Sequence, residues 1–78
     1  MAERFKRDTQ GRICVNGRIY PPTREAMSEA AENHRASARR IVTETLRSSD
    51  CALRIMAVQA ACARRRLARM FDEEARHG

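Results

Sequence analysis

The side chains best suited to chemistry in this sequence are arginines, and their grouping favours binding over catalysis. The densest group is Arg64-Arg65-Arg66, with Arg69 one helical turn further on. A guanidinium presents planar, paired N–H donors that fit a carboxylate or a phosphate. Two more arginines flank a short segment near the N-terminus. The candidate partner-binding residues are Arg12, Arg18, Arg64, Arg65, Arg66 and Arg69.

The same residues also fit an ordinary solvated surface. Fifteen of the sixteen basic residues are arginine, a bias that a GC-rich genome produces without any selection for binding. The spacing of Arg69–Glu73 and of Asp72–Arg76 predicts ion pairs within one helix turn, which would neutralise part of the cluster. Arg64 is different, because it falls within an apolar sector, where we expect it to anchor a contact between subunits.

Catalytic and metal-binding arrangements do not occur in the sequence. No serine or cysteine has a histidine and an acid placed to support it, and no glycine-rich loop could hold a phosphate. The cysteines, at 14, 51 and 62, lack the spacing of a zinc site or a disulfide framework, so we expect reduced, half-buried thiols. His34 is expected to be a packing residue. We therefore expect no enzyme, no catalytic residue, no metal and no cofactor.

The overall charge favours an acidic partner. The chain has 78 residues and a net charge of +6. Residues 1–20 and 51–78 each contribute +3, whereas residues 21–50 are neutral. A field of this sign attracts nucleic acid or an acidic protein face. No apolar run is long enough to cross a membrane and no signal peptide opens the chain, so we expect one cytoplasmic domain, residues 1–78, with no membrane contact.

The elements that must position these residues can be read from local signals. Residues 1–8 look like a flexible basic arm. Asn16-Gly17 is typical of a type I′ turn, which predicts a β-hairpin over 12–20 in which Val15 faces Arg18, Cys14 faces Ile19, and Ile13 faces Tyr20. Residues 5–7 could add a third strand.

Two helices are expected after Pro21-Pro22. Thr23 can cap a helix over 23–48, and Asp50 can cap a second over 50–76. One continuous helix is the alternative, since no glycine closes the first. The predicted fold class is mainly α, a short N-terminal β-hairpin followed by an antiparallel two-helix hairpin. The first helix has a narrow apolar stripe: Met27, Ala30, Ala31, His34, Ala38, Ile41, Val42 and Thr45.

The second helix is apolar on all sides for much of its length. Between Cys51 and Ala63 only Arg54 and Gln59 are polar. Such a helix must be covered on all sides. One neighbouring helix and a small hairpin are not enough to cover it. We therefore predict a homodimer centred on the second helix. Its predicted interface consists of Leu53, Ile55, Met56, Ala60, Ala63, Leu67, Met70 and Phe71.

Two classes of function fit these features. The first is a small basic regulatory protein, an inhibitor or adaptor, that binds a larger acidic or nucleic-acid-handling complex; a phage or mobile-element origin rests only on the small size and the arginine bias. The second is a dimeric DNA-binding repressor that uses the basic hairpin or arm on duplex DNA. Its strand–helix–helix order resembles the outline of the ribbon-helix-helix repressors, although here a hairpin precedes longer helices.

Overall fold

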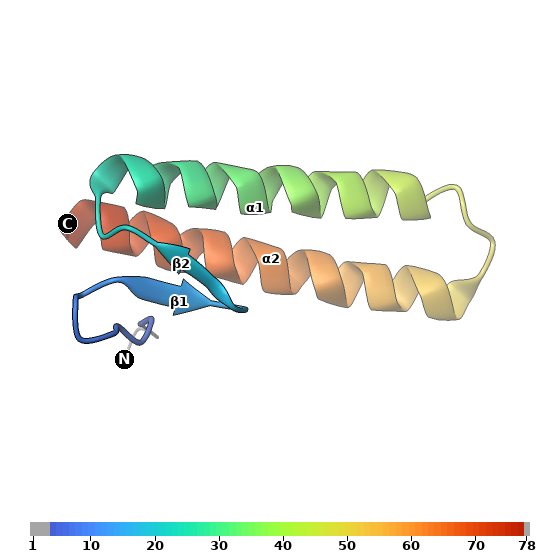
Figure 1. The fold of residues 1–78 in the computed structure, drawn as a ribbon. Helices are drawn as coiled ribbons and strands as arrows, with labels where there is room; N and C mark the ends of the chain where they lie inside the picture. The colour runs from blue at the N-terminus through green and yellow to red at the C-terminus, as the bar shows by residue number, and fades with distance from the viewer. Residues whose placement is uncertain (1–3, 78) are drawn as a thin grey trace.

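The computed structural model describes residues 4–77, which form a two-stranded hairpin followed by two long antiparallel helices (Figure 1). The mainly helical fold class and the break between the helices are confirmed, and one continuous helix is excluded. The elements are β1 (Ile13–Val15), β2 (Arg18–Tyr20), α1 (Arg24–Thr45) and α2 (Cys51–His77).

The β-hairpin has the predicted turn and register. Asn16 and Gly17 have φ values of 52° and 79°, the left-handed conformation that a type I′ turn requires at both positions. The three predicted cross-strand pairs are all formed. Residues 5–7 do not form a third strand; a single bridge joins Arg7 to Ile13.

Short polar side chains set the helix starts. Thr23 is extended, and its hydroxyl accepts a hydrogen bond from the Ala26 N–H at 3.2 Å. Asp50 Oδ1 accepts from the N–H groups of Ala52 and Leu53 at 3.0 and 3.3 Å. These bonds satisfy amides that the first turn of a helix leaves without partners. α1 ends at Thr45, three residues earlier than expected, and a turn follows in which the Ser48 N–H donates to the Thr45 carbonyl at 2.9 Å.

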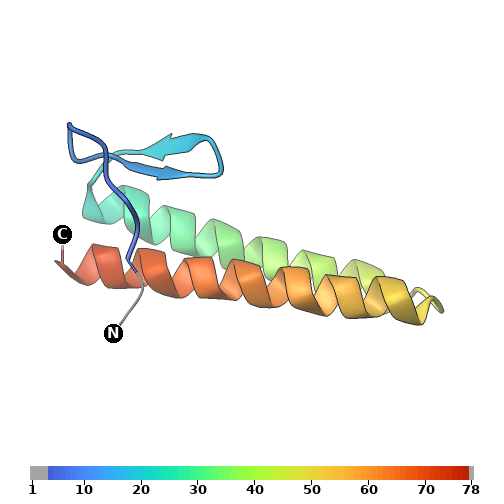
Figure 2. The ribbon, with the colours of Figure 1, turned by 90° about the horizontal axis from the view of Figure 1, so that it is seen from below.

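The core lies at the end of the helix pair where the β-hairpin sits (Figures 1 and 2). Phe71 of α2 is fully buried at its centre. The ring centroid of Phe71 is 4.5 Å from that of Phe5, 4.9 Å from that of Tyr20 and 5.5 Å from that of His34. All three aromatic residues of the chain therefore meet in one cluster, which joins the N-terminal segment, the hairpin and both helices.

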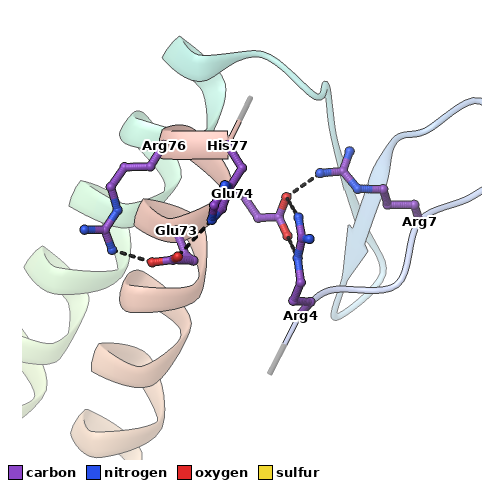
Figure 3. Close-up of polar contacts among 6 residues, drawn as sticks. All are labelled: Arg4, Arg7, Glu73, Glu74, Arg76 and His77. Carbon is purple, nitrogen blue, oxygen red and sulfur yellow. Dashed lines mark hydrogen bonds and ion pairs between the residues drawn. The ribbon is translucent and has the colours of Figure 1, made fainter. Parts of the chain in front are cut away.

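The prediction of a flexible arm over residues 1–8 is wrong for residues 4–8. Phe5 packs on Phe71, and the guanidinium groups of Arg4 and Arg7 converge on the carboxylate of Glu74 (Figure 3). Residues 1–3 of the expected arm lie outside the described residues. The error arose because the apolar and acidic partners of this segment lie almost seventy residues away in the sequence.

α2 does not turn its predicted interface stripe toward α1. Its buried side chains are small except at Phe71 and Glu74, and they form a separate row: Ala57, Ala61, Ala68, Phe71, Glu74 and Ala75. Phe71 was assigned to the dimer interface, and this assignment is wrong, because the side chain is buried within one chain. Leu53, Ile55 and Met56 remain 49%, 60% and 64% exposed.

Candidate binding groove

Four arginine side chains line a groove between the two helices. Arg35 and Arg39 come from α1, and Arg65 and Arg69 come from α2. Residues four apart on a helix lie one above the other on the same face, so each helix contributes a short row of guanidinium groups. The groove has a volume of about 400 Å³. Among the described residues, only these four arginines line it, so the β-hairpin leaves it open.

The charge of this groove is only partly neutralised. Arg35 donates to Asp72 of α2 through Nη2 and to Glu32 through Nη1, the latter at 3.4 Å. Within residues 4–77, the side chains of Arg39, Arg65 and Arg69 form no hydrogen bond or ion pair. Clefts lined by one sign of charge concentrate the field and attract counter-charges. The groove therefore presents three guanidinium groups to an anionic ligand.

Two further hollows lie along the helix pair, one on each side of the arginine section. Toward the loop lies a pit of about 80 Å³, which is apolar apart from Thr45 and Arg54 and is lined by Val42, Thr45, Leu46, Arg54, Ala57 and Val58. Toward the start of α1 lies a polar hollow of about 300 Å³, lined by Arg24, Ser28, Asp72, Ala75 and Arg76. We call the arginine section together with this apolar pit and polar hollow the binding groove.

The sequence spacing explains why these three sections form one surface. Most of the lining residues fall in two series, at positions 24, 28, 35, 39, 42 and 46 on α1 and its C-cap, and at 54, 58, 65, 69, 72 and 76 on α2; Thr45, Ala57 and Ala75 lie beside them. Both series follow the same steps of four, seven, four, three and four residues. Such steps keep to a single face of a helix with 3.6 residues per turn. Each helix therefore contributes one continuous face to the binding groove.

Only two of the six predicted partner-binding residues, Arg65 and Arg69, lie in the binding groove. Arg64 approaches Nδ1 of His34 at 3.2 Å. Arg64 is half-exposed, and this contact lies within one chain.

The hairpin arginines have contacts of their own. Arg12 donates from Nε to Asp8 Oδ2 at 2.9 Å, and the guanidinium of Arg18 lies 5.9 Å from the centre of the Tyr20 ring. Arg66 is exposed and lines none of the three sections of the binding groove.

Sequence reasoning missed Arg35 and Arg39. They lie within residues 21–50, whose net charge is zero, so the distribution of net charge along the chain did not point to them. The signal that would have found them is their four-residue spacing, which Arg65 and Arg69 repeat on the other side of the Ser48–Asp50 turn. An antiparallel helical hairpin places its two helices side by side, so two such rows can line one groove between them.

The predicted ion pairs at the end of α2 differ from those in the structure. Asp72 binds Arg35 of the other helix instead of Arg76. Arg76 pairs with Glu73, whose second oxygen lies 3.0 Å from Nε2 of His77 (Figure 3). A contact between helices therefore replaces the expected contact within one helix. It joins Arg35 of the arginine section to Asp72 of the polar hollow.

Glu74 is a buried carboxylate held by two basic side chains. Arg4 donates from Nε and Nη2 at 3.3 and 3.4 Å, and Arg7 donates from Nη2. Burial by itself raises the pKa of Glu74, but the hydrogen bonds and charges of Arg4 and Arg7 outweigh it and hold this pKa below the ordinary value. This cluster attaches the N-terminal segment to α2.

His34 is buried, as expected for a packing residue, and its ring stacks on Phe71. Burial lowers the pKa of His34, and the nearby charges of Arg64 and Arg18 lower it further. Both effects favour the neutral imidazole, in which one ring nitrogen can accept a hydrogen bond from Arg64.

The cysteines differ from expectation, because Cys14, Cys51 and Cys62 are free and exposed instead of half-buried. Across the part of the chain that the structure describes, no three His, Cys, Asp or Glu side chains are grouped as metal ligands would be. No helix in that part is long and apolar enough to cross a membrane. No family model, curated protein or solved structure matches this chain.

Proposed function

We propose that this chain is a non-enzymatic regulatory protein, an inhibitor or adaptor, that docks on a larger acidic partner through the binding groove. The observation that carries this proposal is the set of three guanidinium groups, those of Arg39, Arg65 and Arg69, which have no acidic partner within residues 4–77. A folded chain gains nothing from holding like charges together, whereas an anionic ligand relieves their repulsion.

We further propose that the working form is a homodimer joined through one stripe of α2. This apolar stripe consists of Leu53, Met56, Ala60, Ala63, Leu67 and Met70. A compact protein of this mass exposes about 4,800 Å² of surface, whereas this chain exposes 5924 Å². The excess, about 1,100 Å², is larger than the roughly 800 Å² that each partner buries in a standard interface. A second copy would cover the exposed apolar groups.

The two surfaces do not compete with each other. Met56 of the apolar stripe and Arg65 of the binding groove are nine residues apart, or two and a half helical turns, which places them on opposite sides of α2. A dimer formed through the stripe would therefore leave one binding groove open on each subunit. Two grooves per dimer would also strengthen attachment to a partner with repeated acidic sites.

A DNA-binding repressor remains the second candidate, with less support. Its proposed contact surface is the basic hairpin and the segment before it. Arg4 and Arg7 of that segment bind Glu74, and Arg12 binds Asp8, so three of its cations already have carboxylate partners. Binding a phosphate backbone would require these pairs to break.

The test is a pull-down from nuclease-treated cell lysate with two matched double variants. Arg65→Gln with Arg69→Gln removes two charges from the binding groove. Arg40→Gln with Arg47→Gln removes two charges from exposed positions outside it. We expect the wild type and the second variant to retain the same stoichiometric partner, and the groove variant to lose it.

The result that would contradict this function is equal recovery of every bound protein on both variants. Duplex DNA is titrated in parallel at about 50 mM salt and again at higher salt. Tight binding that weakens steeply with salt and persists in the groove variant would favour the repressor.

A further inference from the structure

We infer that the binding groove receives an acidic α-helical segment of a partner protein, with an apolar side chain of that segment seated in the apolar pit. This inference rests on the proposed function and names the chemistry of the partner. It depends on the spacing of the arginines, on the position of the pit and on the length of the groove.

The arginine spacing matches a helix that carries carboxylates. Arg35 and Arg39 are separated by about 6 Å along the axis of α1, and the same holds for Arg65 and Arg69 on α2, since each residue of a helix rises about 1.5 Å. Acidic residues four apart on a bound helix have the same separation. A single ligand helix lying between the two rows could therefore pair with both.

The apolar pit favours a protein over a nucleic acid. Its rim includes Leu46 and Val58, which are 65% and 56% exposed, although the pit lies next to a strongly basic surface. A phosphate backbone would bury no apolar group there. A protein segment that combines acidic and apolar side chains would satisfy both parts of the surface, in the manner of an amphipathic helix in a groove.

The distance between the two sections fixes the pattern of the ligand. On the α1 side, the midpoint of Arg35 and Arg39 and the midpoint of Val42 and Leu46 are seven residues apart; on α2, the midpoint of Arg65 and Arg69 and that of Arg54 and Val58 are eleven residues apart. These separations correspond to about 10 Å and about 16 Å, or two to three helical turns. The apolar anchor of the ligand should therefore lie two to three turns from its paired carboxylates, on the same face.

The length of the groove fits a segment of this kind. From Arg24 to Leu46 the lining residues span about 33 Å along α1, the length of a helix of roughly twenty residues. The polar hollow at the far end carries both signs of charge, from Asp72 and from Arg24 and Arg76, so the ligand can be neutral there. The acidic part of the ligand belongs in the middle of the segment and its apolar anchor toward one end.

The experiment is a phage-display selection from a library of random 20-residue peptides, with the full chain as the immobilised target. The recovery of the selected peptides is then measured on each variant of the chain. We expect the recovered peptides to be rich in Asp and Glu at four-residue spacing, with an apolar residue two to three turns away. The best peptide is then synthesised, labelled and titrated by fluorescence polarisation, and circular dichroism reports whether it becomes helical on binding.

Two double variants separate the two sections of the groove. Arg65→Gln with Arg69→Gln should weaken the selected peptide about tenfold, the effect of losing two exposed ion pairs. Leu46→Gln with Val58→Thr should weaken it about fivefold, the effect of losing part of the apolar contact. Arg40→Gln with Arg47→Gln serves as the charge-matched control and should change the affinity less than twofold. All six side chains project from exposed or groove positions, and circular dichroism confirms that each variant is folded.

The inference is overturned if the selection yields peptides without acidic enrichment, if the pit variant binds the selected peptide as well as the wild type does, or if the peptide stays non-helical when bound. A single-stranded or duplex DNA probe that binds through the groove arginines more tightly than every selected peptide would also overturn it. None of these results affects whether the pull-down recovers a partner that depends on the groove arginines. The inference about the ligand can therefore fail while the proposed function stands.

Discussion

Phe71 is buried where the N-terminal segment, the hairpin and the two helices meet. Its neighbours are Phe5, Tyr20 and His34, from three other parts of the chain. The sequence analysis placed Phe71 in the subunit interface, whereas its side chain is fully buried within one chain. An aromatic side chain buries a large apolar area, and a chain with only three of them gains most by packing them together.

Glu74 should make the stability of the chain depend on pH in the acidic range. Its pKa is lowered on folding, so its contribution is fully present above its ordinary pKa of 4.5 and is lost as the pH falls through the lower folded value. We expect Glu74→Gln to lower the free energy of unfolding at pH 7 by about 1–3 kcal/mol, the usual effect of losing hydrogen bonds to a charged group. Below pH 4.5 the variant should lose stability less steeply than the wild type.

Urea denaturation followed by circular dichroism at several pH values from 7 to 3 measures this difference. Glu29→Gln is the control, because Glu29 is exposed on α1. If the free energy of unfolding falls equally steeply with pH below 4.5 in Glu74→Gln and in the wild type, Glu74 is not the source of the acid dependence. His34 adds an earlier step in all three proteins: its folded pKa lies below 6.5, so the unfolded chain binds more protons and stability begins to fall as the pH drops through 6.5.

At the scale of the elements, the turn between the helices depends on one capping side chain. Asp50 Oδ1 accepts two backbone hydrogen bonds at the start of α2. We expect Asp50→Ala to lower the free energy of unfolding by about 1 kcal/mol, a typical effect of removing an N-cap. The measurement is urea denaturation at pH 7. Ser49→Ala, at the exposed neighbouring position, should change stability by less than about 0.5 kcal/mol; equal effects of the two changes would contradict the capping role.

The elements that local chemistry determines could be predicted from the sequence. The Asn16-Gly17 turn fixed the register of the hairpin, because a two-residue loop leaves one pairing of its flanking strands. Thr23 and Asp50 marked the helix starts for the same reason, since a cap acts on amides two or three residues away. These predictions needed no knowledge of the rest of the chain.

The face of α2 that packs on α1 could not be predicted in this way. The helix has two apolar rows, and the row with larger side chains, including Leu53 and Met56, was the natural choice for a seam. The structure uses the alanine row instead, with Ala57, Ala61 and Ala68 buried. Small side chains permit close approach of two helices. Whether two helices approach closely depends also on the residues of the partner helix, so the sequence of α2 alone does not show which row packs. The binding groove was missed for the same reason, because its two rows belong to different helices.

At the scale of the whole molecule, the apolar stripe predicts self-association. We expect the wild type to sediment at micromolar concentration with a mass of about 18 kDa, twice the chain mass of 8.9 kDa. Met56→Glu should raise the dissociation constant on the order of a hundredfold, because a charge would be buried without a partner. Met56 is 64% exposed in the single chain, so this change should leave the fold intact.

Thr43→Glu is the control for that measurement, since it adds the same charge at an exposed position of α1. It should sediment as the wild type does. A wild-type mass near 8.9 kDa for a well-folded species would refute the dimer, and with it the two-groove arrangement, while leaving the single groove and its arginines in place.

The uneven distribution of the core has a consequence for the order in which parts of this molecule open. The aromatic cluster fastens one end of the helix pair, whereas the end near the loop is held mainly by alanines and by the half-buried Ile41 and Val42. Amide hydrogens near the loop should therefore exchange with solvent sooner than those around Phe71. The apolar pit lies at this looser end, so a ligand seated there would slow that exchange, and part of its binding energy would be spent in ordering the helix ends.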